Sequence, residues 1–184
     1  VRFIARLIGE DKSVKILDVG CGPGRHVNKL AKMGYQVIGL DLAKRFLRIA
    51  REDAIAHNLT STWINADARY IPFVGAFDWI LCLCEGAFGI MENDVQNRRV
   101  LEQMANSLKP GGRLLLNVLN AAFIFRHPEN DEYIDLKTST GYWTEIFTTE
   151  EGMTKTEKCW NRYYTFSEIK LLLELVNMTV LDGW

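Results

Sequence analysis

Short apolar runs alternate with longer amphipathic stretches along the first two thirds of the chain. The apolar runs have the length of β-strands, whereas the stretches between them repeat apolar residues every three or four positions, as α-helices do. Alternating strands and helices build parallel sheets through right-handed crossovers, which predicts an α/β fold. The expected strands are residues 14–20, 35–41, 61–67, 77–84 and 113–120, and the expected helices are 25–33, 43–58 and 93–112, after a helix end at 1–9.

Two helices carry more detailed expectations. The inner side of the helix over 43–58 should present four apolar residues, namely Phe46, Leu47, Ile49 and Ala50. Near the end of the chain, a helix is expected over 167–177 with Ser167 as its N-cap, because serine side chains satisfy free backbone N–H groups. A further strand is expected over 178–184.

The pattern changes after Asn120. Residues 121–166 alternate apolar and polar positions around Gly141 and Gly152, which is typical of antiparallel hairpins. We expect an antiparallel ribbon inserted into the α/β frame, within a single domain over 1–184. The insert is rich in aromatic residues. As a lid it would enclose an apolar or planar ligand, and the alternative is that it packs on the sheet edge or pairs with a second copy as a homodimer.

Composition argues against some classes of partner. The 22 lysines and arginines nearly balance 23 aspartates and glutamates, so a basic surface for nucleic acid is not expected. No apolar run approaches the roughly 20 residues of a membrane span, so no membrane partner is expected. The cysteines have neither CxxC nor zinc spacing, which predicts reduced thiols, no metal site and a cytoplasmic protein; they are Cys21, Cys82, Cys84 and Cys159.

Three glycines occupy the expected turn after the first strand, in the stretch LDVGCGPGRH. Gly20, Gly22 and Gly24 lack a Cβ atom, so they allow positive φ angles and let a ligand approach the backbone. The third glycine of a dinucleotide-binding fingerprint would fall at position 25, which is Arg25, and this counts against NAD. Asp18 precedes the turn and favours a cationic ligand over a pyrophosphate.

Two further acids follow the next two strands. Asp41 ends the second strand, where a carboxylate can accept hydrogen bonds from both hydroxyls of a ribose. Asp67 follows the third strand, where it is either a helix cap or a ligand contact that accepts from the amine of adenine, with the Ala68 N–H reaching a ring nitrogen. Since parallel strands end at one edge of the sheet, Asp18, Asp41 and Asp67 predict a nucleoside site there.

These motifs together resemble class I S-adenosylmethionine-dependent methyltransferases over roughly residues 10–120. The resemblance rests on LDVGCGPG, VIGLDLA, NADAR, FDWILCLCEGAFG and LKPGGRLLLNV, in this order. It implies a Rossmann-like, doubly wound, mostly parallel sheet of order 3-2-1-4-5-7-6. Because the chain begins at Val1 and stops at Trp184 in the sixth expected strand, we interpret it as a fragment truncated before the last strand.

The resemblance also implies roles for individual residues, with S-adenosylmethionine as the cofactor. Gly20, Cys21 and Gly22 would line its methionine portion, with Asp18 supporting the amino group, and Gly24 would also belong to the cofactor-binding turn. Asp41 would hold the ribose, Leu42 would pack on the adenine, and Asp67 and Ala68 would contact the adenine edge. The residues expected to face the methionine end and the transferred methyl are Cys84 and Glu85.

The expected activity is in-line transfer of the methyl group to an O, N, S or C atom of a small molecule. Glu85 is the candidate general base, although it could instead contact the cofactor amine or a helix start. Arg162 or Tyr164 could orient the acceptor. The chain lacks the Asn/Asp-Pro-Pro-Tyr/Phe signature of nucleic-acid and protein amide methyltransferases. The alternatives are an NAD(P)-dependent oxidoreductase, a non-catalytic S-adenosylmethionine-binding protein, and an RNA or protein methyltransferase.

Overall fold

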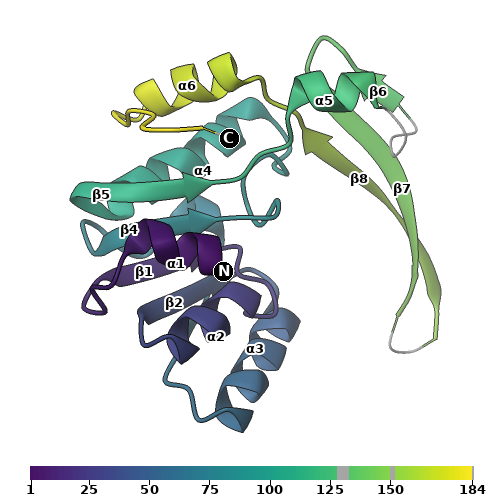
Figure 1. The fold of residues 1–184 in the computed structure, drawn as a ribbon. Coiled ribbons are helices and arrows are strands. Elements are labelled where there is room, and N and C mark those ends of the chain that lie inside the picture. Colours follow the sequence, from purple (N-terminus) through teal and green to yellow (C-terminus); the bar gives the residue numbers. More distant parts are fainter. Residues whose placement is uncertain (128–132, 150–151, 184) are drawn as a thin grey trace.

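The computed structural model describes residues 1–127, 133–149 and 152–183. It contains a five-stranded parallel sheet of order β3-β2-β1-β4-β5 and a separate three-stranded antiparallel sheet (Figure 1). The parallel strands are β1 (Lys15–Val19), β2 (Gln36–Asp41), β3 (Thr62–Asn65), β4 (Phe77–Cys82) and β5 (Leu108–Leu116). The doubly wound α/β fold and the order of its first five strands are therefore confirmed.

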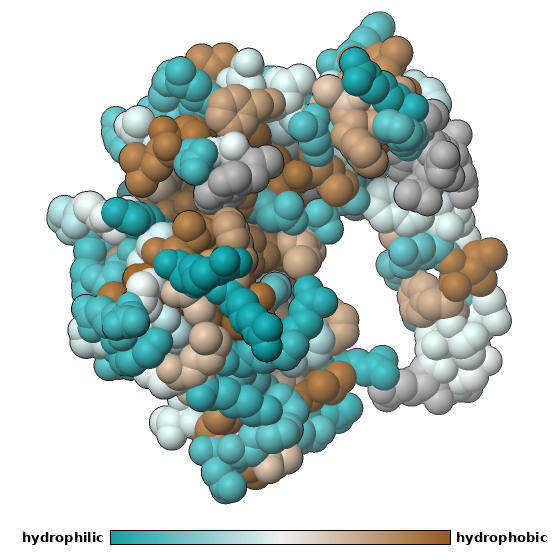
Figure 2. Space-filling view, in the orientation of Figure 1, coloured by the Kyte–Doolittle hydropathy of each residue, from teal (hydrophilic) through white to brown (hydrophobic). Residues whose placement is uncertain are grey.

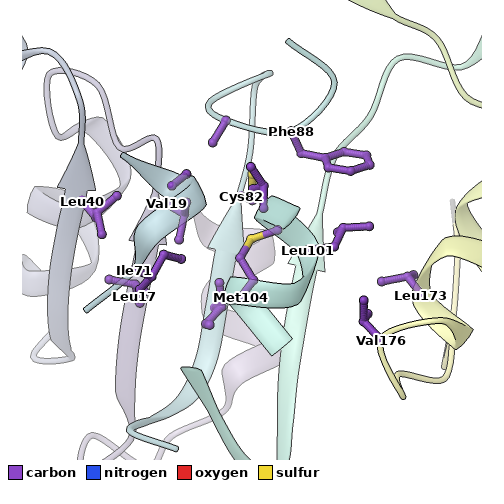
Figure 3. Close-up of a cluster of buried hydrophobic side chains, with 14 of the residues drawn as sticks. Leu17, Val19, Leu40, Ile71, Cys82, Phe88, Leu101, Met104, Leu173 and Val176 are labelled. Atoms are coloured by element: carbon purple, nitrogen blue, oxygen red, sulfur yellow. The ribbon is translucent and has the colours of Figure 1, made fainter. Parts of the chain in front are cut away.

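Helices cover both faces of the parallel sheet (Figure 1). One face packs against α1 (Arg2–Ile8), α2 (Arg25–Lys32) and α3 (Lys44–Ala56), and the other against α4 (Asp94–Ser107) and α6 (Phe166–Glu174). A strand between two helical layers must be apolar on both sides, and β1 meets this requirement because Ile16 and Leu17 are both fully buried in different clusters. Figure 3 shows part of the cluster that contains Leu17, on the face covered by α4 and α6. Its labelled members include Leu17, Val19, Cys82, Leu101, Met104, Leu173 and Val176.

The boundary between α4 and β5 differs from the prediction. The helix ends at Ser107, and β5 begins at Leu108, which pairs with Phe77, rather than at Arg113, which pairs with Trp79; Gly111 between them has a positive φ of 77°. Proline disfavours helical backbone in the residue before it, so the helix ends early. The pairing of β4 with β5 is irregular between Phe77 and Trp79, as in a β-bulge. The extra residues of β5 lie at this irregularity.

Two helix predictions were wrong in detail. The N-cap of α6 is Thr165, whose hydroxyl accepts from the Glu168 N–H in a capping box, so Ser167 lies inside the helix. In α3 the buried residues are Leu47, Ala50 and Ala54, whereas Phe46 and Ile49 are 45% and 40% exposed. The reason is geometric, since positions 47, 50 and 54 follow one helical stripe and positions 46 and 49 flank it.

The antiparallel sheet confirms the expected ribbon. It consists of β6 (Tyr133–Asp135), β7 (Thr140–Thr148) and β8 (Thr154–Arg162) in the order β6-β7-β8. A short helix that the alternating pattern did not predict, α5 (Ala121–Arg126), precedes it. In Figure 1 the ribbon of β7 and β8 runs along the side of the molecule at which β4 and β5 end.

The last expected strand is not formed over residues 178–183, and Trp184 lies outside the described residues. Met178 and Val180 pack against the core cluster without joining a β-ladder. In the part of the chain that the structure describes, no helix is long and apolar enough to cross a bilayer.

Candidate functional site

The three glycines of the turn after β1 have positive φ angles of 71°, 52° and 80°, but their surroundings differ. A Cβ atom on Gly20 would collide with the carbonyl group of Gly86, and one on Gly24 would lie 2.6 Å from the ring of Trp63. A Cβ on Gly22 would meet no described atom within 4 Å. Two of the glycines are therefore required for packing within the protein, and Gly22 alone opens toward free space.

Hydrogen bonds hold this turn against the end of β2. The carbonyl oxygen of Leu40 accepts from the N–H groups of Gly20 and Cys21, at 2.8 and 3.0 Å. The Asp41 carboxylate accepts from the N–H of Gly22 at 2.7 Å. The Cys21 side chain is buried beneath the turn, and burial raises the pKa of its thiol, so this cysteine stays protonated and unreactive.

Asp18 is the most unusual group of the site. It is 1% exposed, and within the described residues its Oδ2 atom has no hydrogen-bond partner. Burial and the nearby charge of Asp41 raise its pKa to about 7, against the opposing effect of Arg25. His26 Nδ1 lies 4.0 Å from Oδ2, too far for a hydrogen bond, and burial lowers the pKa of His26, so it remains neutral. Oδ2 is thus a buried acceptor without a donor among the described residues.

Asp41 is held from two sides at the end of β2. Its second carboxylate oxygen accepts from the Ala43 N–H at 2.8 Å, so the backbone fixes the orientation of the whole group. Each oxygen keeps a further lone pair, which is what a contact with ribose hydroxyls would use. Leu42, the residue expected to pack on adenine, is 68% exposed. Asn65 at the end of β3 donates to the carbonyl oxygens of Asp41 and Leu42, which ties the two strand ends together.

Asp67 caps the short helix η1 (Ala68–Tyr70) that follows β3. It accepts from the Arg69 N–H at 2.9 Å, and the Arg69 guanidinium binds both carboxylate oxygens, with Nη2 at 2.6 Å from Oδ2. These bonds to Arg69 lower the pKa of Asp67 and keep it ionised. The sequence left two roles open for Asp67, a helix cap or a ligand contact, and in the structure Asp67 acts as the helix cap. Ala68 itself is buried, and contact of Asp67 and Ala68 with adenine stays a prediction.

The loop after β4 lies against the glycine turn. Cys84 and Glu85 both adopt left-handed backbone conformations, with φ of 56° and 51°, before Gly86 packs on Gly20. Such conformations are costly for residues with a Cβ atom and are common at functional sites. The Arg25 guanidinium donates to the exposed Cys84 thiol at 3.2 Å, which joins this loop to the start of α2. Glu85 is partly buried, and its role as a base stays a prediction.

Three contributors to the site were not predicted from sequence. Arg25 and Asn117 hold the loop after β4, since the Asn117 side chain accepts from the Cys84 N–H at 3.1 Å. Trp63 packs between Gly24 and Gly39. Arg25 was visible in the sequence as the residue directly after the third glycine, but only the folded structure brings Trp63 and Asn117 to the turn.

The expected acceptor contacts Arg162 and Tyr164 instead join the ribbon to the frame. The Arg162 guanidinium binds Asp94 at 3.1 Å and Glu168 at 2.8 Å, so its charge is already balanced. Tyr164 is 2% exposed and stacks on Phe88 with ring centroids 5.0 Å apart. Among the described residues, no three side chains of His, Cys, Asp or Glu converge as metal ligands would.

Comparison with known proteins shows which family the chain resembles. Residues 16–112 match the family model described as a methyltransferase domain, which is more than half of the chain. The ubiquinone biosynthesis O-methyltransferase of Albidiferax ferrireducens is 33% identical over 109 residues, 58% of this chain and 41% of that protein. The enzyme of the same name from Leptothrix cholodnii is 28% identical over 123 residues, 65% of this chain and 50% of that protein. The chain thus spans half or less of the length of these relatives.

Solved structures share the fold. The CcbJ methyltransferase from Streptomyces caelestis superimposes with a TM-score of 0.77 at 19% identity, over 92% of this chain and 74% of that one. An S-adenosylmethionine-dependent methyltransferase from Clostridium acetobutylicum gives a TM-score of 0.71 at 18% identity, over 91% and 74% of the two chains. The fold is that of class I methyltransferases, and with the match over residues 16–112 it shows that the chain belongs to the methyltransferase domain family.

Proposed function

We propose that the whole protein transfers the methyl group of S-adenosylmethionine to a small molecule. The observation that carries this proposal is the buried, unpartnered carboxylate of Asp18 beside the open backbone at Gly22, within a methyltransferase domain. A group that binds there must bring a hydrogen-bond donor or a positive charge to Asp18, because a buried polar atom without a partner is costly. The amino end of S-adenosylmethionine supplies both.

The remaining residues of the crevice fit the other parts of the cofactor. Gly20, Cys21, Gly22 and Gly24 shape the wall of the methionine portion, with Cys84 opposite them in the loop after β4. Asp41 is oriented by backbone N–H groups to accept from ribose hydroxyls. The proposed contacts of the adenine are Leu42, Asp67 and Ala68.

The bound cofactor supplies an electrophilic methyl group on a sulfonium, which a nucleophile displaces while the sulfur keeps the electrons of the broken bond. The chain's own contribution is to align the two reactants and exclude water, which can supply about 7–11 kcal/mol of the barrier. For an acceptor with a weakly acidic hydroxyl, Glu85 would take up the proton that is released. It lies at the turn where the β4 loop meets the glycine turn.

The acceptor is proposed to be a small molecule with an O, N, S or C nucleophile. The names of the ubiquinone biosynthesis relatives favour an oxygen atom. Balanced charge, with 22 basic and 23 acidic residues, does not favour an RNA or protein acceptor. The family match and the shared fold do not favour an NAD(P)-dependent oxidoreductase.

Three further proposals concern the organisation of the protein. Residues 1–184 would form a single methyltransferase domain with 121–166 as its lid, in the cytoplasm, where its four free cysteines stay reduced. A second copy of the chain is the proposed partner for dimerisation through this insert. Its support is the set of large apolar side chains that the ribbon exposes, such as Ile146 and Met153.

Calorimetry with S-adenosylmethionine, S-adenosylhomocysteine and NADH tests the cofactor. Both sulfur nucleosides should bind and NADH should not; binding of NADH alone would overturn the assignment. Incubation with methyl-labelled S-adenosylmethionine and a panel of metabolites then tests catalysis. Label that stays on the cofactor with every metabolite, despite tight binding, would favour the non-catalytic alternative.

A further inference from the structure

One face of the antiparallel sheet carries a row of three aromatic residues. Tyr133 in β6 pairs directly with Tyr142 in β7, which pairs directly with Trp160 in β8. Directly paired residues of antiparallel strands project from the same face, so the three side chains form a continuous row across the sheet. The rings of Tyr133 and Tyr142 are stacked with centroids 6.1 Å apart at 26°, and they are 61% and 39% exposed.

This face is the one held against the loop after β4. The Trp160 ring N–H donates to the carbonyl oxygen of Met91 at 3.2 Å, and the Arg162 N–H donates to that of Gly89 at 2.7 Å. The same loop begins with Cys84 and Glu85, where the methyl group is expected. The aromatic row therefore starts at the loop that borders the proposed methyl-transfer site and extends away from it across the antiparallel sheet, from β8 to β6.

The ribbon stands apart from the α/β body over part of its length. Figure 1 places the ribbon on the side where β4 and β5 end, and Figure 2 shows a gap between this ribbon and the α/β body. The exposed rings of Tyr133 and Tyr142 present a flat apolar surface to a planar molecule. Aromatic rings bind other flat rings well, because stacking buries much surface and costs little conformational freedom.

The charges on the two faces of the ribbon differ. Lys158, two residues before Trp160, lies on the aromatic face, and no carboxylate of the described residues is within ion-pair distance of it. On the opposite face Glu145 and Glu157 are directly paired, so like charges meet there. The aromatic face thus offers an unused cation, whereas on the opposite face the paired glutamates weaken the attraction of Lys155 for an anion.

We propose that Tyr133, Tyr142 and Trp160 form the platform on which the methyl acceptor stacks, and that Lys158 binds an acidic group on it. The substrate class would be a planar aromatic ring that carries a carboxylate or a comparable anion. This inference rests on the proposed function, since it assigns the acceptor of the same site. Burial of the row against a second copy is the alternative that the experiment below separates.

Calorimetry in the presence of saturating S-adenosylhomocysteine tests the platform with three probes. They are 3,4-dihydroxybenzoate, 3,4-dihydroxybenzyl alcohol without the charge, and 3,4-dihydroxycyclohexanecarboxylate without the flat ring. The benzoate should bind about tenfold more tightly than either of the others, because only it uses both the rings and the lysine. Lys158→Met should remove its advantage over the alcohol, and Tyr142→Leu its advantage over the cyclohexane acid, whereas Tyr142→Phe should keep it.

Matched controls lie on the opposite face of the same two strands. Lys155→Met in β8 and Phe147→Leu in β7 should leave all three affinities unchanged. Equal binding of the three probes, or the same losses in the control variants, would overturn the proposal. So would sedimentation showing that Tyr142→Leu converts a dimer to a monomer in a protein whose parent form binds none of the probes. Failure of S-adenosylhomocysteine to bind would instead refute the proposed function, so the two failures are distinguishable.

Discussion

Replacing Asp18 with asparagine removes a buried charge from the centre of the site. Burial raises the pKa of this carboxyl from 3.8 to about 7 in the folded protein, whereas the unfolded chain keeps the lower value. Between these values the folded protein holds a proton that the unfolded chain has released, so its contribution to stability falls as pH rises through this window and is constant above it. A pKa difference of about 3 corresponds to about 4 kcal/mol.

Asp18→Asn should therefore make the free protein more stable at about pH 8 and weaken its binding of the cofactor. The unpaired N–H groups of the buried amide offset about 1–3 kcal/mol of the gain, which leaves about 1–3 kcal/mol. Binding weakens because a neutral amide cannot balance the ammonium group of S-adenosylhomocysteine. Opposite changes in stability and affinity are expected where a strained group serves a ligand.

Urea unfolding between about pH 5 and about pH 8 measures the first effect, and calorimetry measures the second. Asp78→Asn is the matched control. Lys109 Nζ lies 2.8 Å from the Asp78 carboxylate, and this contact lowers the pKa of Asp78, so its stabilisation is present above about pH 4 and lost on acidification. The control should be less stable than the parent by a similar amount at each pH. The burial argument is wrong if the stability difference between Asp18→Asn and the parent does not change with pH.

Four other substitutions test three separate parts of the site. Gly20→Ala should lower the melting temperature strongly, because its methyl group meets the Gly86 carbonyl. Gly22→Ala should cost only about 1–2 kcal/mol of stability, from its positive φ, and should reduce cofactor affinity. Equal melting temperatures of the two variants would contradict this difference. Asp41→Ala should weaken cofactor binding by about 1–3 kcal/mol in calorimetry, and unchanged affinity would exclude the ribose contact. Glu85→Gln should lower kcat about 100-fold or more with a hydroxyl acceptor while S-adenosylhomocysteine affinity is retained; unchanged kcat would remove Glu85 as the base.

Local pattern was sufficient to predict most of the α/β frame. Burial on both faces makes most positions of β1 and β4 apolar, and an alternating strand–helix order allows few connections between parallel strands. The same reasoning failed for segments whose secondary structure depends on contacts with residues distant in the sequence. Leu108 looks like part of the helix before it, but it pairs with Phe77 at the start of β4. Residues 178–183 look like a strand but have no ladder to join among the described residues.

In the candidate site, too, some features follow from the local sequence and others depend on tertiary packing. The spacing of Gly20, Gly22 and Gly24 after an apolar strand marks a tight turn with positive φ angles, since this depends only on the residues themselves. Which glycine opens to a ligand depends on the atoms that tertiary packing brings opposite each one, such as Gly86 and the Trp63 ring. The shifted pKa of Asp18 likewise has no counterpart in the local sequence, because burial and the neighbouring charge of Asp41 arise only when β1 and β2 lie side by side.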